Sequence, residues 1–189
     1  MREIFIEILL IPDDPLIPVY VAYRYLNEMT TSEIQKTLVF GDSHVSKMED
    51  YLFNICAVDG VGGRNVKDWE TSWERLSEET FSKVVLFIGG NDITPHNGAP
   101  VQEISDTVKA FKKLTTKLLQ AGKTVVVCSV ITRTGYKKQI DWLNSRLRKM
   151  YRANFLQIPE DIQVLDNFGV HLLPSYYKLV AEFLHYVLQ

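Results

Sequence analysis

The chain has 189 residues, of which 46% are hydrophobic and 23% are charged, a balance typical of a globular protein with a packed core. This length predicts one domain, and the lack of long Pro, Gly, Ser or single-charge runs argues against a disordered chain. The formal net charge of −2 gives no electrostatic reason to expect a polyanion partner, so nucleic-acid binding is not favoured.

The first 36 residues do not follow the pattern of the rest of the chain. Two apolar runs, at 3–10 and 19–25, are separated by three prolines. We expect residues 1–36 to form an added hairpin or arm that covers one edge of a sheet; the alternative is a surface for self-association or for docking a partner protein. Glu3 and Glu7 interrupt the apolar start and no small-residue cleavage site follows, so a secretory signal is not predicted.

The sequence also bears on location and on bound groups. No uninterrupted run approaches the roughly 18 apolar residues that a transmembrane helix requires, so we expect a soluble, cytoplasmic protein. No spacing of His, Cys and acidic residues resembles a metal site, and no cofactor is expected.

From residue 36 onward, short apolar runs alternate with longer segments of helical period, which predicts βαβ units and a parallel sheet. Five strands are predicted, at residues 37–40, 54–58, 83–88, 124–131 and 162–165. Apolar residues three and four apart predict helices at 101–119 and 140–151, and Pro174 begins a last helix. We therefore expect residues 37–189 to form a three-layer α/β/α sandwich around a flavodoxin-like five-stranded parallel sheet.

A serine follows the first predicted strand directly, in the segment Gly41-Asp42-Ser43-His44. Ligands of open parallel sheets bind outside the carboxyl ends of the strands, where a helix N-terminus offers free N–H groups to a developing negative charge. Ser43 is therefore a candidate nucleophile, although a plain helix N-cap is the alternative interpretation. The neighbouring His44 is expected to be exposed on the first turn of the helix.

Two other strands end in segments that suit an oxyanion site. The third strand runs into the letters GGND, which bring the side-chain amide of Asn91 to the same edge of the sheet. After the second strand, the letters GVGG end at Gly63, where the backbone can approach a ligand closely and direct an N–H at it. A flexible turn is the alternative at Gly63; a nucleotide loop is not predicted because its glycine spacing and its Lys-Ser/Thr ending are missing.

The last predicted loop supplies a histidine, His171, just before the helix that begins at Pro174. A lone histidine is more often structural than catalytic. This one, however, arrives at the same edge of the sheet as Ser43, Gly63 and Asn91, so it is a candidate general base.

Taken together, the segment GDS, the glycine after the second strand, the segment GGND and the late segment GVHL resemble the four blocks of the SGNH (GDSL-like) hydrolases in order and spacing. The likeness covers about residues 37–189. It implies that Ser43 attacks a carbonyl and that His171 removes its proton. It also implies that the Ser43 N–H, the Gly63 N–H and the Asn91 amide stabilise the oxyanion. The expected activity is hydrolysis of an acyl ester, such as a lipid or an acetylated sugar.

One residue departs from the family pattern. Members of the family usually have an aspartate three residues before the histidine, and this chain has Phe168 there. Asp166, five residues before His171, is a candidate to orient the ring; a main-chain carbonyl could do so instead and leave a Ser-His dyad. In a triad of another fold, disabling the acid lowers turnover about ten-thousand-fold, so the change is compatible with a weak enzyme.

Two functions of other classes stay open. A catalytically weak or inactive SGNH-like domain could bind RNA or protein through basic residues on the helix at 137–152, although such a run is more often a solvated helix face. These basic residues are Lys137, Lys138, Arg146, Arg148, Lys149 and Arg152. A flavodoxin-like cofactor or signalling domain shares the sheet topology and is a weaker alternative.

Overall fold

The sheet sets the frame of the molecule. The computed structural model describes residues 36–52, 54–94 and 103–188, and its strands form one parallel sheet in the order β2-β1-β3-β4-β5. The predicted flavodoxin-like order of five parallel strands is therefore confirmed. The strands are β1 (Thr37–Gly41), β2 (Ala57–Gly60), β3 (Lys83–Phe87), β4 (Thr124–Cys128) and β5 (Phe155–Leu156).

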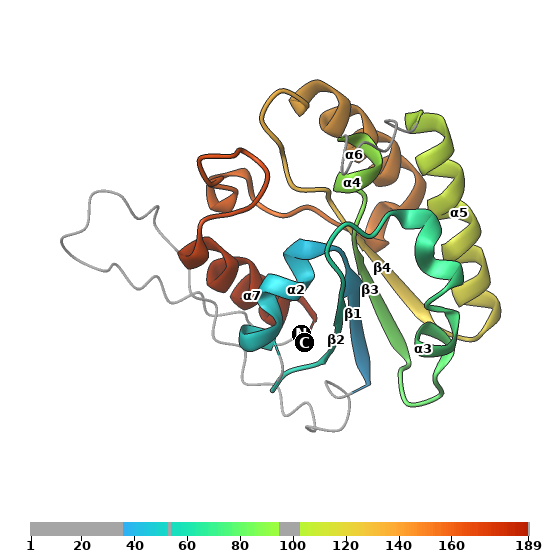
Figure 1. The fold of residues 1–189 in the computed structure, drawn as a ribbon. Helices are drawn as coiled ribbons and strands as arrows, with labels where there is room; N and C mark the ends of the chain where they lie inside the picture. Colours follow the sequence, from blue (N-terminus) through green and yellow to red (C-terminus); the bar gives the residue numbers. More distant parts are fainter. Residues whose placement is uncertain (1–35, 53, 95–102, 189) are drawn as a thin grey trace, which may run out of the picture.

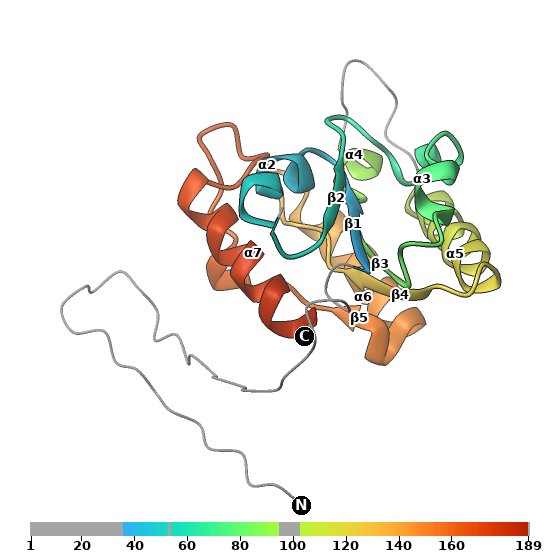
Figure 2. The same cartoon turned by 90° about the horizontal axis from the view of Figure 1, so that it is seen from below.

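Helices cover both faces of this sheet and complete the predicted three-layer sandwich (Figures 1 and 2). On one face lie α2 (Ser43–Leu52) and α7 (Pro174–Leu188), and on the other lie α3 (Trp73–Ser77), α5 (Ile104–Gln120) and α6 (Lys137–Tyr151). The short elements that join them are α4 (Gly90–Ile93) and the 3-10 turns η1 (Val66–Glu70), η2 (Arg152–Asn154) and η3 (Glu160–Ile162).

The apolar runs of the strands follow from burial on both faces. In β1, Leu38 and Phe40 pack in the core beneath α5 and α6, whereas Val39 packs in the core beneath α2 and α7. A strand that is covered on both sides gains from an apolar residue at every position, so its sequence does not alternate. Burial on both faces therefore explains why the apolar runs in the sequence could be recognised as buried strands.

The positions of some strands differ from the prediction. The second strand begins at Ala57 and not at residue 54, and the fourth ends at Cys128 and not at 131. The predicted strand at 162–165 is wrong: Ile162 ends η3, and Leu165 makes an isolated antiparallel bridge with Leu172. The true β5 is a two-residue pairing with the end of β4, which is too short to leave an apolar run in the sequence.

The strand order has a switch point between β1 and β3. From β1 the chain crosses to β2 on one side, and it then returns to form β3 on the other side of β1. Such a switch point leaves a crevice at the carboxyl ends of the two strands. The segments that carry Ser43 and Asn91 leave the sheet there. The arm predicted at 1–36 lies outside the described residues, apart from Lys36, and stays a prediction.

Candidate active site

The candidate nucleophile and base come together from distant parts of the chain. Ser43 is the first residue of α2, and its Oγ lies 3.0 Å from Nε2 of His171, 128 positions further along the chain. The structure therefore brings the hydroxyl and the imidazole within hydrogen-bonding reach. When Nε2 accepts the serine proton, the other ring nitrogen, Nδ1, carries a proton and requires an acceptor to orient it.

Asp166 lies on that second side of the ring. Its Oδ2 is 3.8 Å from Nδ1 of His171, which is ion-pair range but longer than a hydrogen bond. Its Oδ1 accepts from the backbone N–H groups of Phe168, Val170 and His171 at 3.2, 3.3 and 3.4 Å. Burial pushes the pKa of Asp166 upward, but these N–H groups and the charge of His171 outweigh it, and the pKa is lowered.

Phe168, at the position where SGNH hydrolases usually have an aspartate, faces away from the site. The side chain of Phe168 is 87% exposed, so the position three residues before His171 points into solvent. The loop instead turns back on itself, because the backbone N–H of Asp166 donates to the His171 carbonyl at 2.7 Å. This turn brings the carboxylate of Asp166, two residues before Phe168, to the Nδ1 side of the imidazole.

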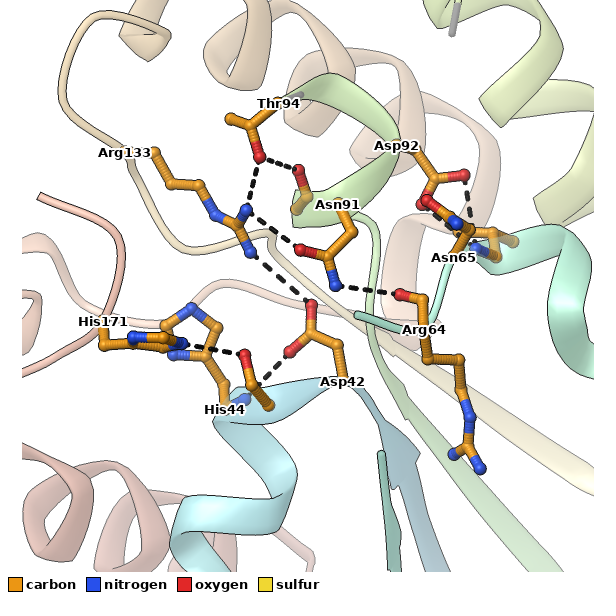
Figure 3. A network of polar contacts seen from close by, with 12 residues as sticks. Asp42, His44, Arg64, Asn65, Asn91, Asp92, Thr94, Arg133 and His171 are labelled. Carbon is orange, nitrogen blue, oxygen red and sulfur yellow. Dashed lines mark hydrogen bonds and ion pairs between the residues drawn. The ribbon is translucent and has the colours of Figure 1, made fainter. Parts of the chain in front are cut away.

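Asn91 is held in one orientation by two partners of opposite kind. Its Oδ1 accepts from Nη1 of Arg133 at 3.1 Å, and its Nδ2 donates to the backbone carbonyl of Arg64 at 3.1 Å (Figure 3). A guanidinium only donates and a carbonyl only accepts, so the amide cannot be turned over without losing both bonds. The second N–H of Nδ2 is not used by the Arg64 carbonyl and can serve another acceptor.

Gly63 lies in the turn that follows β2. Its φ of 78° is in the left-handed region, which glycine adopts without strain. The next residue, Arg64, is buried and fastens the turn to the sheet: Nη1 donates to the carbonyls of Gly41 and Asp59 at 3.0 and 2.7 Å. Because Gly41 ends β1 just ahead of Ser43, the turn is held beside the segment that carries the nucleophile.

Asp42 is a buried acid that the sequence did not single out. Its Oδ1 accepts from the backbone N–H of His44 at 2.9 Å, and its Oδ2 lies 3.9 Å from Nη2 of Arg133. Burial raises the pKa of Asp42 to about 6, against the opposing effects of the His44 N–H and of the charges on Arg133 and Arg64. The carboxylate braces the first turn of α2 behind the serine.

The expectation that His44 is exposed is wrong. Its side chain is 3% exposed, and the centre of its ring lies 5.7 Å from that of His171, edge towards face. The first turn of α2 presents this position to α7 and to the loop of His171, and not to water, because α7 packs against α2. Burial and the nearby charge of Arg133 lower its pKa well below the usual range, so His44 is neutral.

Arg133 is the other site residue that sequence reasoning missed. It follows β4 in the loop at 129–136 and is 3% exposed. The available signal was a charged side chain in the loop beyond an apolar strand, at the edge of the sheet where ligands bind.

No group of three or more His, Cys, Asp or Glu side chains that could hold a metal ion occurs among the described residues. Likewise, none of the helices in the described part of the chain is both long and apolar enough to cross a membrane.

Comparisons with known proteins bear on the fold. No family model matches the chain, and no curated protein matches it by sequence. Solved structures do match. A protein of Bacteroides fragilis that is described as an acylhydrolase superimposes with a TM-score of 0.66 and 18% identity, over 81% of this chain and 86% of the other. A GDSL-like lipase of Bacteroides thetaiotaomicron gives a TM-score of 0.65 and 18% identity, over 82% and 88%.

A third neighbour is a carbohydrate acetylesterase family member from Sinorhizobium meliloti, with a TM-score of 0.63 and 16% identity over 80% of this chain and 95% of the other. These superpositions establish the fold. At identities this low, the chemistry has to be argued from the residues of this chain itself. The fold is that of the SGNH, or GDSL-like, hydrolases.

Proposed function

We propose that this chain is a serine ester hydrolase that cleaves an acyl or acetyl ester through a covalent intermediate on Ser43. The observation that carries the proposal is the 3.0 Å approach of the Ser43 Oγ to Nε2 of His171 at the switch point of the sheet. A serine hydroxyl is a poor nucleophile until a positioned base removes its proton. The contact between the two side chains is what such an activated nucleophile requires.

In the first half of the reaction, Oγ of Ser43 forms a bond to the ester carbonyl carbon while Nε2 of His171 takes the hydroxyl proton. The carbonyl π electrons move to the oxygen, which becomes an oxyanion. The backbone N–H groups of Ser43 and Gly63 and the free N–H of the Asn91 amide are the proposed donors to it. One such donor typically contributes about 2.7 to 4 kcal/mol of transition-state stabilisation.

In the second half, the tetrahedral intermediate collapses. The carbon–oxygen bond to the leaving group breaks, and Nε2 of His171 returns its proton to the departing alkoxide. Water then attacks the carbonyl carbon of the acyl-Ser43 ester while Nε2 of His171 takes the water proton. The second tetrahedral intermediate collapses, the bond from this carbon to Oγ breaks, and Nε2 returns the proton to Oγ, which releases the acid product and restores Ser43. Asp166 orients the ring and stabilises the imidazolium that forms twice in this cycle. Its 3.8 Å distance from Nδ1 is short enough for that electrostatic role.

The proposed substrate is a small-molecule or lipid ester. Two of the structural neighbours are described as a GDSL-like lipase and a carbohydrate acetylesterase family member, and these descriptions support ester chemistry for this chain. The proposed residues need no metal and no cofactor for either half-reaction, since each proton moves between Ser43, His171, water and the leaving group.

A fluorophosphonate probe tests the proposal, because it forms a stable adduct only with an activated serine. We expect the native chain to be labelled and to hydrolyse p-nitrophenyl acetate, and Ser43→Ala and His171→Ala to lose both properties. Ser46→Ala is the matched control: it removes an exposed hydroxyl from the same helix and should keep both. Labelling that survives in Ser43→Ala, or a folded native chain that is not labelled, would overturn the assignment.

A second candidate is an SGNH-like domain that binds a partner and hydrolyses weakly or not at all. The observation in its favour is that the acid lies beyond hydrogen-bonding distance of the imidazole, at 3.8 Å. A basic surface on α6 could then contact RNA or a protein. Some of its cations are engaged locally, since Lys137 pairs with Asp141 at 3.0 Å and Arg146 lies over the ring of Trp142.

The exposed pair Lys138 and Lys149 allows a test of the binding surface on α6. For an RNA-binding domain, replacing both lysines with glutamate should weaken RNA binding and reduce its salt dependence. Equal RNA affinity in the variant and the native chain would reject this surface. Fluorophosphonate labelling of the same preparations separates the two proposals, because only the hydrolase requires an activated Ser43.

A further inference from the structure

Arg133 is a buried cation whose hydrogen bonds are concentrated at one point of the site. It is 3% exposed, and its Nη1 donates to Oδ1 of Asn91 at 3.1 Å and to Oγ1 of Thr94. Neither Nε nor Nη2 has a hydrogen-bond partner among the described residues, although Nη2 is 3.9 Å from Oδ2 of Asp42. Burying a guanidinium with unused donors is costly, and the cost calls for a role other than holding the fold together.

The other buried arginine of the site shows the contrast. Arg64, 8% exposed, donates from two nitrogens to two backbone carbonyls and to the carboxylate of Asp59. Those bonds join β1 to the turn after β2, which is a structural task. Arg133 instead directs its hydrogen bonds to α4, the short helix that carries Asn91, and to the residue that follows that helix (Figure 3).

From these contacts we infer that Arg133 is a positioning residue for the oxyanion donor Asn91. This inference rests on the proposed hydrolase function. Arg133 holds the carbonyl end of the amide, and the Arg64 carbonyl holds one N–H. With two of its polar positions fixed, the amide has one N–H left, whose direction is then set by the planar geometry of the group.

The charge of Arg133 adds to this geometric effect. A cation at Oδ1 draws electron density from the amide, which makes the N–H groups on Nδ2 stronger donors, and such polarisation is larger in a buried site. Asp42 offsets this charge only in part, since its other oxygen accepts from the backbone of His44.

Gly90 leaves room for this arrangement. A Cβ at position 90 would lie 2.4 Å from Nη2 of Arg133, so an alanine there would push the guanidinium away from α4. No left-handed φ is required of Gly90, and the close approach of Arg133 is therefore the reason that glycine fits. Gly90→Ala thus displaces the cation without removing it, which provides a second, independent way to disturb Asn91.

The test is a double-mutant cycle on p-nitrophenyl acetate hydrolysis. Removal of one oxyanion donor lowers kcat about 10²- to 10³-fold. Arg133→Met misplaces the donor without removing it, so we expect its kcat to be lower than that of the native chain by about tenfold or more, with little change in KM. Arg133→Lys keeps a charge without the planar fork and should fall between the native chain and Arg133→Met. In an Asn91→Ala background, Arg133→Met should lower kcat by no more than about twofold, because coupled residues are not additive.

The matched control is Lys123→Met. Lys123 is also a buried cation, 7% exposed, but it lies just before β4 at the opposite end of the sheet and donates to the carbonyls of Glu78 and Phe81. This variant should lose stability and keep kcat. An equal loss of kcat from Arg133→Met in the native and Asn91→Ala backgrounds, or no loss in a folded Arg133→Met or Gly90→Ala variant, would overturn the inference.

Hydrogen exchange at the Asn91 side-chain amide separates this inference from the proposed function. The amide protons should exchange slowly in the native chain and faster in Arg133→Met, Arg133→Lys and Gly90→Ala, whether or not the chain hydrolyses esters. Unchanged exchange in all three variants would reject the positioning role even in an active enzyme. A native chain without Ser43-dependent hydrolysis would reject the hydrolase function, and the exchange rates would still decide whether Arg133 positions the amide.

Discussion

The hydroxyl oxygen of Tyr177 lies 3.2 Å from Nδ1 of His44, and it also lies 3.2 Å from the backbone nitrogen of Leu172. The N–H of Leu172 donates to the phenol oxygen, and the same oxygen forms a second hydrogen bond with the imidazole of His44. Through Tyr177, both α2 and α7 are linked to the residue that directly follows His171, and these hydrogen bonds help to hold the loop that carries His171.

Replacing this tyrosine tests the arrangement. Tyr177→Phe removes both hydrogen bonds and leaves a buried backbone N–H and a buried imidazole nitrogen unpaired, which costs about 1 to 3 kcal/mol of unfolding free energy for each group left unsatisfied. Ester turnover should fall as well, because the loop of His171 loses an anchor. Urea unfolding and kcat measure the two effects. Tyr51→Phe, the same change at an exposed position of α2, should alter neither by much, and equal behaviour of the two variants would contradict the role of Tyr177.

Asp166→Asn tests the acid. Asparagine keeps an oxygen for the backbone N–H groups of the loop, but it removes the negative charge beside Nδ1 of His171. By analogy with a triad of another fold, kcat should fall by up to about 10⁴-fold, with the fold intact. Asp161→Asn, an exposed acid of η3, should leave kcat unchanged. Turnover in Asp166→Asn equal to that of the native chain would favour a Ser-His dyad.

An aspartate at the family's usual position should not repair that loss. Position 168 points into solvent, as the 87% exposure of Phe168 shows, so a carboxylate there has no path to the imidazole without rebuilding the loop. We therefore expect the double variant Phe168→Asp/Asp166→Asn to stay as slow as Asp166→Asn in kcat. The single variant Phe168→Asp should change the unfolding free energy by less than about 0.5 kcal/mol, as exposed substitutions do. Recovery of kcat in the double variant would show that the loop can rearrange.

Most of the fold and the outline of the site could be predicted from the sequence. Strands buried on both faces leave apolar runs, and in a parallel sheet all carboxyl ends lie at one edge. Those two facts predicted that the segments of Ser43 and Asn91 lie at one edge of the sheet. For His171 the argument used a fifth strand at 162–165 that is wrong, although the structure does bring Ser43 and His171 to 3.0 Å. The second and third predicted helices also correspond to α6 and α7, whose apolar stripes repeat at helical spacing.

What could not be predicted depends on contacts between distant segments. The burial of His44 is set by α7, and that of Arg133 by α4, and neither helix is adjacent in sequence to the residue it covers. Single-residue patterns carry no record of such packing. For the same reason β5 was misplaced: its two residues pair with β4 through backbone hydrogen bonds, which any sequence can make. The arm at 1–36 lies outside the described residues and stays a prediction.

The raised pKa values of two buried acids, Asp42 and Asp92, predict how the free energy of unfolding depends on pH. Burial is the main cause that raises the pKa of Asp42 to about 6 and that of Asp92 to about 7, from the usual 3.8 of an aspartate. The folded state thus binds these protons more tightly than the unfolded state. Their stabilising contribution is complete below pH 3.8 and is lost as the pH rises through 6 to 7. For Asp42 alone, a shift of about two pKa units corresponds to roughly 3 kcal/mol.

Urea unfolding between pH 4 and 7 measures this loss. The buried His44, whose pKa is lowered well below the usual 6.5, gains stability as the pH rises through this window, and it opposes the two acids in the native chain and in the variant alike. The difference between the two proteins therefore reports the acid: as the pH rises, the native chain should lose more stability than Asp92→Asn, because asparagine does not ionise. The lowered pKa of Asp166 acts in the opposite direction, but its contribution is lost only as the pH falls towards and below 3.8, outside the window. A slope in Asp92→Asn that equals that of the native chain would contradict the assignment to this acid.

Two glycines, Gly60 at the end of β2 and Gly62 in the turn after it, should respond differently to the same substitution. A Cβ at Gly60 would lie 2.2 Å from the backbone nitrogen of Ser46, whereas a Cβ at Gly62 meets nothing within 4 Å. Neither position has a left-handed φ, so the comparison isolates the steric effect. The clash at Gly60 is with backbone of α2, which can yield only if the helix moves away from β2. Overpacking of this kind costs about 1 to 3 kcal/mol or more.

We therefore expect Gly60→Ala to lower the midpoint of urea unfolding strongly and Gly62→Ala to leave it nearly unchanged. Because α2 begins at Ser43, a displaced helix would also shift the serine relative to His171, so a folded Gly60→Ala should react more slowly with the fluorophosphonate. Native stability and labelling in Gly60→Ala would mean that α2 does not pack on β2 as closely as the structure shows. The helix that carries the nucleophile would then owe its position to its contacts with α7 and β1.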